Sequence, residues 1–205
     1  MIDKIQFMKW YIIRHGQTEY NKNGIVQGSG IDAPLNETGL KQAESFFNQN
    51  KNISFDKLYT SDLIRTHQSV EQFSKTLPIN KLSGLNEINW GEKEGNKIDF
   101  GKKSDFSILI NDWQNGNLDS SFKNGESPLQ VTKRQKNAID QIKSNGGKNI
   151  LICMHGRAMR IFLSQLLDTP LQKMDQYEHS NLCLYVLEWN GKEFKLLVKN
   201  KAVEI

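Results

Sequence analysis

The sequence predicts an α/β protein, because strand-like and helix-like segments alternate along the chain instead of collecting in separate regions. Two further observations support this prediction. The strand-like runs are short and apolar, and polar loops that contain glycine follow them. The chain has 205 residues, 37% of them hydrophobic, which suits one sizeable core better than two. We therefore expect a single domain over residues 1–205.

The first predicted elements are a strand and a helix. Residues 9–13 form a short, β-rich apolar run, which indicates a buried strand, and residues 1–7 before it are expected to be an extension without a structural role. A helix is predicted over residues 36–50, where Asn36 is a good N-cap and apolar side chains recur at helical spacing.

A second strand and a second helix are predicted next. Residues 55–60 form the strand, since they are again mostly apolar. The helix after them should be capped by Ser61 with Asp62 and should end at Pro78, because proline cannot continue a helix.

Capping and apolar patterns also define the second half of the chain. Ser127-Pro128-Leu129-Gln130 combines an N-cap serine, proline at the first helical position and a capping-box glutamine, so a helix is predicted from there to about Ser144. Residues 149–154 are the most continuous apolar run and predict a buried strand. The remaining elements are a helix after His155-Gly156 and a hairpin of residues 182–189 and 194–198, joined by Asn190-Gly191.

Residues 91–124 differ from the rest of the chain. Their periodicity is weak, they are rich in Asn and Lys, and their aromatic residues are isolated. We expect this segment to be an insertion that caps one face of the domain. In that case it could present Trp113 and Phe122 to a ligand, with Ile25 as the apolar wall opposite. Alternatively, these aromatic residues only anchor the segment to the domain.

Composition excludes several classes of partner and location. Lys and Arg number 27 against 23 Asp and Glu, and the net charge of +4 is not gathered in long runs, so nucleic acid is not expected as a partner. No apolar run is long enough to span a membrane or form a signal peptide. Cys153 and Cys183 lie in apolar runs without redox or metal-ligand spacing, which predicts reduced core thiols in a cytoplasmic protein. The sequence also lacks the paired histidine and cysteine patterns of metal sites, so no metal or other cofactor is expected.

The arginine and histidine residues indicate the chemistry. Only five residues are Arg, and three of them lie with two of the four His near the carboxyl ends of predicted strands: Arg14, His15, Arg65, His155 and Arg157. These strand ends form the usual ligand crevice of a parallel sheet. Guanidinium groups bind phosphate oxygens in pairs, so the set predicts a phosphate site.

The same residues resemble a known family. Arg14-His15-Gly16-Gln17-Thr18-Glu19-Tyr20-Asn21 is similar to the signature of the histidine phosphatase superfamily, the phosphoglycerate mutase-like proteins. Further motifs follow in the family's order: Gln27-Gly28 with Asp32, Tyr59 to Arg65, Leu85-Asn86-Glu87 with Gly91 and Glu94-Gly95, Gly125-Glu126-Ser127, and His155-Gly156. The resemblance covers about residues 8–181.

This resemblance implies a three-layer α/β/α fold with a mostly parallel central sheet and hydrolysis of a small phosphorylated metabolite without a metal. It implies that His15 is the nucleophile and that Arg14, Arg65 and His155 hold the phosphoryl oxygens. Glu87 would be the general acid and then the base for water. The arginines should also keep His15 neutral, because a nearby positive charge disfavours the imidazolium form.

Other site residues are expected to contact substrate. The resemblance implies this for Thr18, Asn21, Gln27, Gly28 and Gly156. Arg157 stands where many family members have a small residue, so it could bind a second anionic group of the substrate or pair with a carboxylate. His67 and His179 have no partner motif, and each is expected to be a surface or packing residue.

Two alternatives to a phosphatase stay open, namely a phosphoglycerate mutase and a non-catalytic phosphate- or partner-binding module. The full set of Arg14, His15, Arg65, Glu87 and His155 argues against the module. The segment from Glu87 to Gly125 is short and contains no Arg, unlike the longer insertion with an arginine pair in the family's mutases. The phosphatase is therefore the expected activity, with a small phosphorylated substrate as partner and a homodimer left open.

Overall fold

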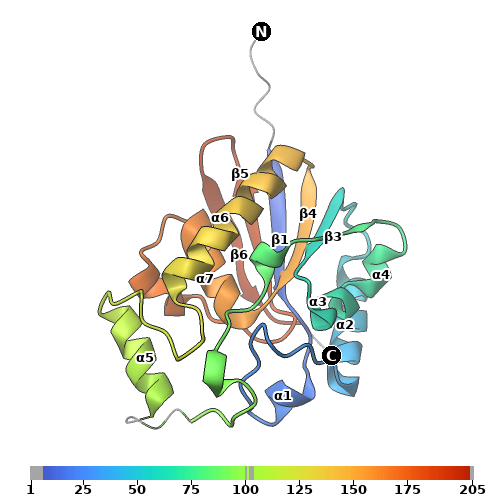
Figure 1. Cartoon of the computed structure of the whole chain (residues 1–205). Coiled ribbons are helices and arrows are strands. Elements are labelled where there is room, and N and C mark those ends of the chain that lie inside the picture. The colour runs from blue at the N-terminus through green and yellow to red at the C-terminus, as the bar shows by residue number, and fades with distance from the viewer. Residues whose placement is uncertain (1–6, 100, 102–103, 204–205) are drawn as a thin grey trace.

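A six-stranded sheet forms the centre of the computed structural model, which describes residues 7–99, 101 and 104–203 (Figure 1). The strand order is β3-β2-β4-β1-β5-β6. The first four strands in this order are parallel, and β5 and β6 are antiparallel to their neighbours. The strands are β1 (Met8–Arg14), β2 (Lys57–Thr60), β3 (Ile79–Lys81), β4 (Asn149–Met154), β5 (Leu184–Trp189) and β6 (Phe194–Lys201).

Helices cover both faces of this sheet (Figure 1). In β1, Trp10 and Ile12 pack in the core with α6 and α7, whereas Ile13 packs in a second core with α2 and α4. Successive residues of a strand point to opposite faces of the sheet. Because helices cover both faces, the residues on each face must be apolar, and this explains the continuous apolar runs. The α-helices are α1 (Glu19–Lys22), α2 (Glu37–Asn50), α3 (Ile64–Ser69), α4 (Glu71–Ser74), α5 (Asp105–Gln114), α6 (Pro128–Asn145) and α7 (Gly156–Leu166). The three-layer α/β/α fold with a mostly parallel sheet is thus confirmed.

Local signals fixed several element boundaries correctly. The Asn36 side chain accepts a hydrogen bond from Gly39 N at 2.9 Å and begins α2. Ser127 and Gln130 form the expected capping box at the start of α6. The two C-terminal strands pair as a hairpin across Asn190-Gly191.

The single helix expected after Ser61 is wrong. Two short helices replace it, α3 and α4, and they meet at Val70, whose backbone is not helical (φ −121°, ψ 11°). Leu63, not Ser61, is the N-cap of α3, because the Ser61 hydroxyl bonds to Leu63 N and to the His155 ring instead. The strand β3 after Pro78 and the helix α5 were not expected.

The segment of residues 91–124 packs beside the main layers rather than within them. Its helix α5 lies apart from the sheet (Figure 1), and Leu109 and Trp113 of α5 pack with Ile88, Val131 and Ile161 in a third apolar cluster. Three short 3₁₀ helices complete the described chain: η1 (Ser83–Leu85), η2 (Gly91–Lys93) and η3 (Leu171–Gln176).

The described residues also bear on the expected thiols, metals and membrane spans. Cys153 and Cys183 are both buried and unpaired, as expected. Among the residues placed by the structure, no group of three His, Cys, Asp or Glu side chains could hold a metal ion, and no helix has both the length and the apolarity that a membrane span needs. The expected role of residues 1–6 lies outside the described residues.

Candidate active site

The carboxyl ends of three parallel strands bring the predicted residues together. Arg14 is the last residue of β1, and His15 follows it. Arg65 is the second residue of α3, shortly after β2, and His155 directly follows β4 as the N-cap of α7. Because β1 and β2 both pair with β4, these three loops start at one edge of the sheet.

The His15 ring is held in one tautomer. Its Nδ1 lies 2.7 Å from the carbonyl oxygen of Gly16, and a carbonyl can only accept a hydrogen bond, so Nδ1 carries the proton. The Nε2 lone pair is then available to a ligand. Burial, followed by the charges of Arg65 and Arg14, lowers the pKa of His15 well below its ordinary value, which keeps the ring neutral.

Arg65 and His155 form the layer behind His15. The rings of His15 and His155 are 5.1 Å apart. Arg65 Nε donates to His155 Nδ1 at 3.2 Å, so His155 Nε2 carries a proton, which it donates to Ser61 Oγ at 2.8 Å. Burial and the charge of Arg65 lower the pKa of His155. Both residues are completely buried, and neither lines the open cavity.

Arg65 is oriented by backbone oxygens. Its Nη1 donates to Ile31 O at 2.7 Å and its Nη2 donates to Gly28 O at 3.1 Å. A guanidinium group has five N–H donors, and three of those of Arg65 are used in these two bonds and in the bond to His155. Gly28 thus contributes a carbonyl to Arg65 and does not line the cavity.

A cavity of about 280 Å³ lies in front of His15. Seven predicted site residues line it: Arg14, His15, Asn21, Gln27, Glu87, Gly156 and Arg157. Thr18 does not, because it is fully buried and caps α1. Its hydroxyl donates to Gln27 Oε1 at 2.8 Å, and the buried Gln27 Nε2 has no hydrogen-bond partner among the described residues. Thr18 therefore orients Gln27, which offers its amide N–H groups to a ligand.

The Glu87 carboxylate sits at the start of α7. It accepts hydrogen bonds from Ala158 N at 2.8 Å, from Arg157 N at 3.1 Å and from Ile88 N at 2.8 Å. Only 6% of Glu87 is exposed. These bonds fix both carboxylate oxygens beside the cavity that His15 also lines.

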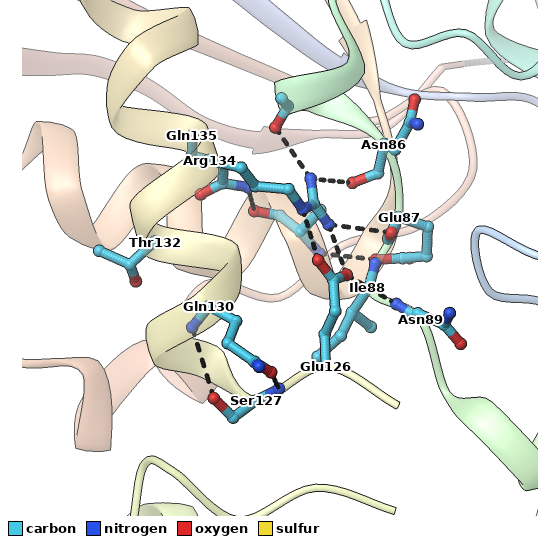
Figure 2. Close-up of polar contacts among 12 residues, drawn as sticks. Asn86, Glu87, Ile88, Asn89, Glu126, Ser127, Gln130, Thr132, Arg134 and Gln135 are labelled. Carbon is cyan, nitrogen blue, oxygen red and sulfur yellow. Dashed lines mark hydrogen bonds and ion pairs between the residues drawn. The ribbon is translucent and has the colours of Figure 1, made fainter. Parts of the chain in front are cut away.

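The backbone that carries Glu87 is held by an arginine of α6 (Figure 2). Arg134 donates to the carbonyl oxygens of Gly84, Asn86 and Glu87 at 2.9 to 3.0 Å. It also forms a two-point ion pair with Glu126 at 2.9 and 3.0 Å. The Glu126 carboxylate in turn accepts a hydrogen bond from Asn89 N on the other side of Glu87.

Two residues that line the cavity were missed from sequence. His179 was expected to be a surface or packing residue, and this is wrong: it lines the cavity, and its Nδ1 lies 3.3 Å from Arg14 Nη1. A Cβ on Gly156 would lie 2.7 Å from the His179 ring, which explains the glycine after His155. Arg160 also lines the cavity, one helical turn beyond Arg157. Arg157 pairs with Asp175 at 2.6 Å, as one of its two sequence alternatives expected, and it also lines the cavity, so the other alternative stays a prediction.

Of the two alternatives for the aromatic residues of segment 91–124, anchoring to the domain agrees with the structure and contact with a ligand does not. Trp113 and Phe122 do not line the cavity. Trp113 is completely buried, and its indole N–H donates to Ser120 O at 2.8 Å. Ile25 lines the cavity, as expected, and further apolar side chains of the wall are those of Trp90, Ile98, Phe106 and Ile110.

Comparisons with known proteins agree with this geometry. A family model described as the histidine phosphatase superfamily (branch 1) matches residues 10–202. The broad-specificity phosphatase YOR283W of Saccharomyces cerevisiae is 32% identical over 176 residues, which are 80% of this chain and 72% of the yeast protein. The mouse fructose-2,6-bisphosphatase TIGAR is 39% identical over 93 residues, 42% of this chain, so the match spans about a third (35%) of that relative's length. The crystal structure of a putative α-ribazole-5′-phosphate phosphatase from Escherichia coli has a TM-score of 0.83, is 25% identical, and aligns with 97% of this chain and 98% of that one.

Proposed function

The chain belongs to the histidine phosphatase superfamily, and from this membership and the cavity geometry we propose that it hydrolyses phosphate monoesters of small metabolites through a phosphohistidine on His15. The observation that carries the proposal is the state of the His15 ring. Its Nδ1 is tied to Gly16 O, its pKa is lowered, and it lines a cavity that Arg14 and Glu87 also line. Such a ring is a nucleophile at neutral pH.

In the first step, His15 Nε2 attacks the phosphorus atom and the ester P–O bond breaks. Arg14, which lines the cavity, donates hydrogen bonds to the phosphoryl oxygens, and the positive charge of Arg65 behind His15 stabilises the negative charge on them. His155 acts through Arg65, from which its Nδ1 accepts a hydrogen bond, because its own Nε2–H is donated to Ser61. Glu87, in its protonated form, gives its proton to the leaving oxygen, so the alcohol departs neutral. Glu87 is left as the carboxylate.

In the second step, water attacks the phosphorus atom of the phosphohistidine. The Glu87 carboxylate removes a proton from this water, the N–P bond breaks, and its electron pair returns to His15 Nε2. Inorganic phosphate leaves, and Glu87 is again protonated. Glu87 carries out the proton transfers of both steps and Arg14 and Arg65 supply the positive charge, so the proposal requires no metal or other cofactor.

We assign the other predicted residues to the substrate. Asn21, Gln27, Gly156 and Arg157 line the cavity and would contact it directly, whereas Thr18 would act through Gln27, and Gly28 through Arg65. We also propose that the chain is one domain whose residues 91–124 serve as the cap, because Ile98, Phe106 and Ile110 of this segment line the cavity. The two buried, unpaired thiols support a reducing cytoplasmic location. The homodimer stays a prediction.

Trapping the phosphoenzyme tests the mechanism. With 4-nitrophenyl phosphate, the Glu87→Gln variant should release about one equivalent of nitrophenolate per site and accumulate an acid-labile, base-stable phosphoenzyme. The phenolate leaves without a proton, whereas the attacking water lacks its base. The double variant His15→Ala/Glu87→Gln is the matched control and should show neither signal. A phosphoenzyme in the double variant would overturn the role of His15.

The same assay separates a phosphatase from a mutase and tests for a metal. A phosphatase releases the labelled phosphoryl group as inorganic phosphate, whereas a mutase returns it to a hydroxyl group of the substrate pool. Excess chelator should leave wild-type turnover intact, because the arginine side chains supply the positive charge. Loss of activity that one divalent ion restores would contradict the metal-free mechanism.

A further inference from the structure

We infer that the cavity contains a second anion-binding subsite, formed by Arg157 and Arg160, which selects phosphate monoesters whose alcohol part carries a carboxylate. This inference rests on the proposed phosphatase function and names its substrate class. It starts from two arginines that the proposed chemistry does not use. They lie on one face of α7 and line the same cavity as His15.

The two arginines share one counterion. Arg157 Nη1 lies 2.6 Å from Asp175 Oδ1, and Arg160 Nη1 contacts the same oxygen atom. Asp175 is their only hydrogen-bonded acid among the residues that the structure describes, and it also accepts a bond from Gln114. One carboxylate balances one of two guanidinium groups, so a surplus of one positive charge is left on this wall.

Unused donors accompany the surplus charge. The buried Nε atom of Arg160 has no hydrogen-bond partner among the described residues, and the same holds for Arg14 Nε. Arg157 lies with its guanidinium carbon 5.4 Å from the centre of the Trp113 ring, which fixes the group in place. The Arg157 and Arg160 side chains are only 14% and 20% exposed, so an anion here would meet them partly shielded from water.

The neighbouring histidine is consistent with a positive wall. Burial, followed by the charges of Arg14, Arg160 and Arg157, which face His179, lowers the pKa of His179 to about 2. His179 therefore stays neutral and does not add charge at neutral pH. The surplus positive charge therefore comes from the arginines alone.

The surplus and the shape of the site favour a carboxylate over a second phosphate. One carboxylate would bring the pair of arginines and Asp175 to neutrality, whereas a phosphate dianion would leave an excess negative charge. Both arginines also line an adjoining cavity of about 700 Å³, so the carboxylate has room beside them. The apolar wall of Ile25, Trp90, Ile98, Phe106 and Ile110 fits a carbon skeleton between the two anionic groups.

A pair of matched substrates tests the subsite. 4-Carboxyphenyl phosphate and 4-carbamoylphenyl phosphate have nearly the same shape, and only the first carries the second negative charge. The wild-type protein should have a kcat/KM about tenfold or more higher for the carboxylate, as expected for a hydrogen bond between charged groups. The ratio of the two kcat/KM values cancels any loss that affects both substrates.

Two variants should move this ratio in opposite directions. Arg157→Gln removes the surplus charge and should bring the ratio close to one. Asp175→Asn removes the competing carboxylate and should raise the ratio above the wild-type value. Lys173→Gln is the matched control, because Lys173 is exposed on η3, lines neither cavity and loses the same unit of charge. The control should keep the wild-type ratio.

The outcomes separate the subsite from the proposed function. Equal kcat/KM values for the two substrates in the wild-type protein, or a lower ratio in Asp175→Asn, would overturn the subsite while leaving the phosphatase proposal standing. If neither substrate is hydrolysed, the phosphatase proposal fails. In that case the affinities of the two esters, measured by calorimetry, test the subsite. Equal affinities would overturn it.

Discussion

Acidification should destabilise this protein because of three imidazoles in and behind the cavity. Burial lowers the pKa of His15, His155 and His179, and the neighbouring arginine charges lower each of them further. In the unfolded chain each of these groups has a pKa of about 6.5. Between these two values the unfolded state binds protons that the folded state does not, so stability falls as the pH falls.

The size of the effect follows from the number of groups. Between pH 7.5 and pH 5.5, a histidine that stays neutral in the folded state and titrates at about 6.5 in the unfolded state costs about 1.4 kcal/mol of stability. Three such histidines cost about 4 kcal/mol, a large part of the 5–15 kcal/mol that typically stabilises a domain. Asp175 has a lowered pKa and contributes only at lower pH, outside this window.

Urea unfolding at the two pH values measures this difference directly. The free energy of unfolding should be about 4 kcal/mol smaller at pH 5.5 than at pH 7.5. In a His179→Gln variant the difference should shrink by about a third, because one of the three groups is gone. A free energy of unfolding that is the same at both pH values would refute the conclusion that these rings are held neutral.

Three further predictions concern the acid, its support and the cap. Glu87→Gln should reduce kcat/KM for alkyl phosphates by at least about 100-fold more than for 4-nitrophenyl phosphate, because only an alkoxide needs the proton; equal losses in steady-state assays would contradict the acid role. Arg134→Lys cannot reach three carbonyls and Glu126 together, so urea unfolding should show a loss of about 2–4 kcal/mol; an unchanged midpoint would mean that the contacts shown in Figure 2 add no stability. Trp113→Ala should cost about 3–5 kcal/mol as a cavity in a packed cluster. It should leave the kcat/KM ranking of substrates without a second anionic group unchanged, because Trp113 does not line the cavity. An altered ranking among these substrates would restore Trp113 as a substrate contact.

The parts of the fold that the sequence predicts well are those in which a local pattern decides the structure. The boundaries of β4, residues 149–154, were predicted correctly. Both faces of this strand are buried, so no polar residue interrupts its apolar run. The start of α6 was predicted because Ser127 and Gln130 satisfy free backbone N–H groups without help from the rest of the fold. These are short-range effects, and a single sequence contains them completely.

The errors occur where a distant partner decides. Serine is a residue that often caps helices, but the Ser61 hydroxyl forms a hydrogen bond with the ring of His155, 94 residues away. His179 has no motif around it and reaches the cavity only because the loop before β5 runs beside the end of β1, where Arg14 ends the strand. Helix α5 was missed because its apolar residues pack in a third cluster, separate from the two cores on either side of the sheet, and its periodicity in the sequence is weak.

The support of Glu87 shows how a motif can be seen in sequence while its physical role is not. Glu126 lies in the Gly125-Glu126-Ser127 motif, and sequence alone offers it no partner. In the structure Glu126 pairs with Arg134 at both carboxylate oxygens. Arg134 also donates a hydrogen bond to the backbone carbonyl oxygen of Glu87. Glu87 is therefore held twice, by α6 through its backbone and by the start of α7 through its carboxylate. A group fixed at both ends can stay within reach of a leaving oxygen without reorganisation, which is what proton transfer at a defined site requires.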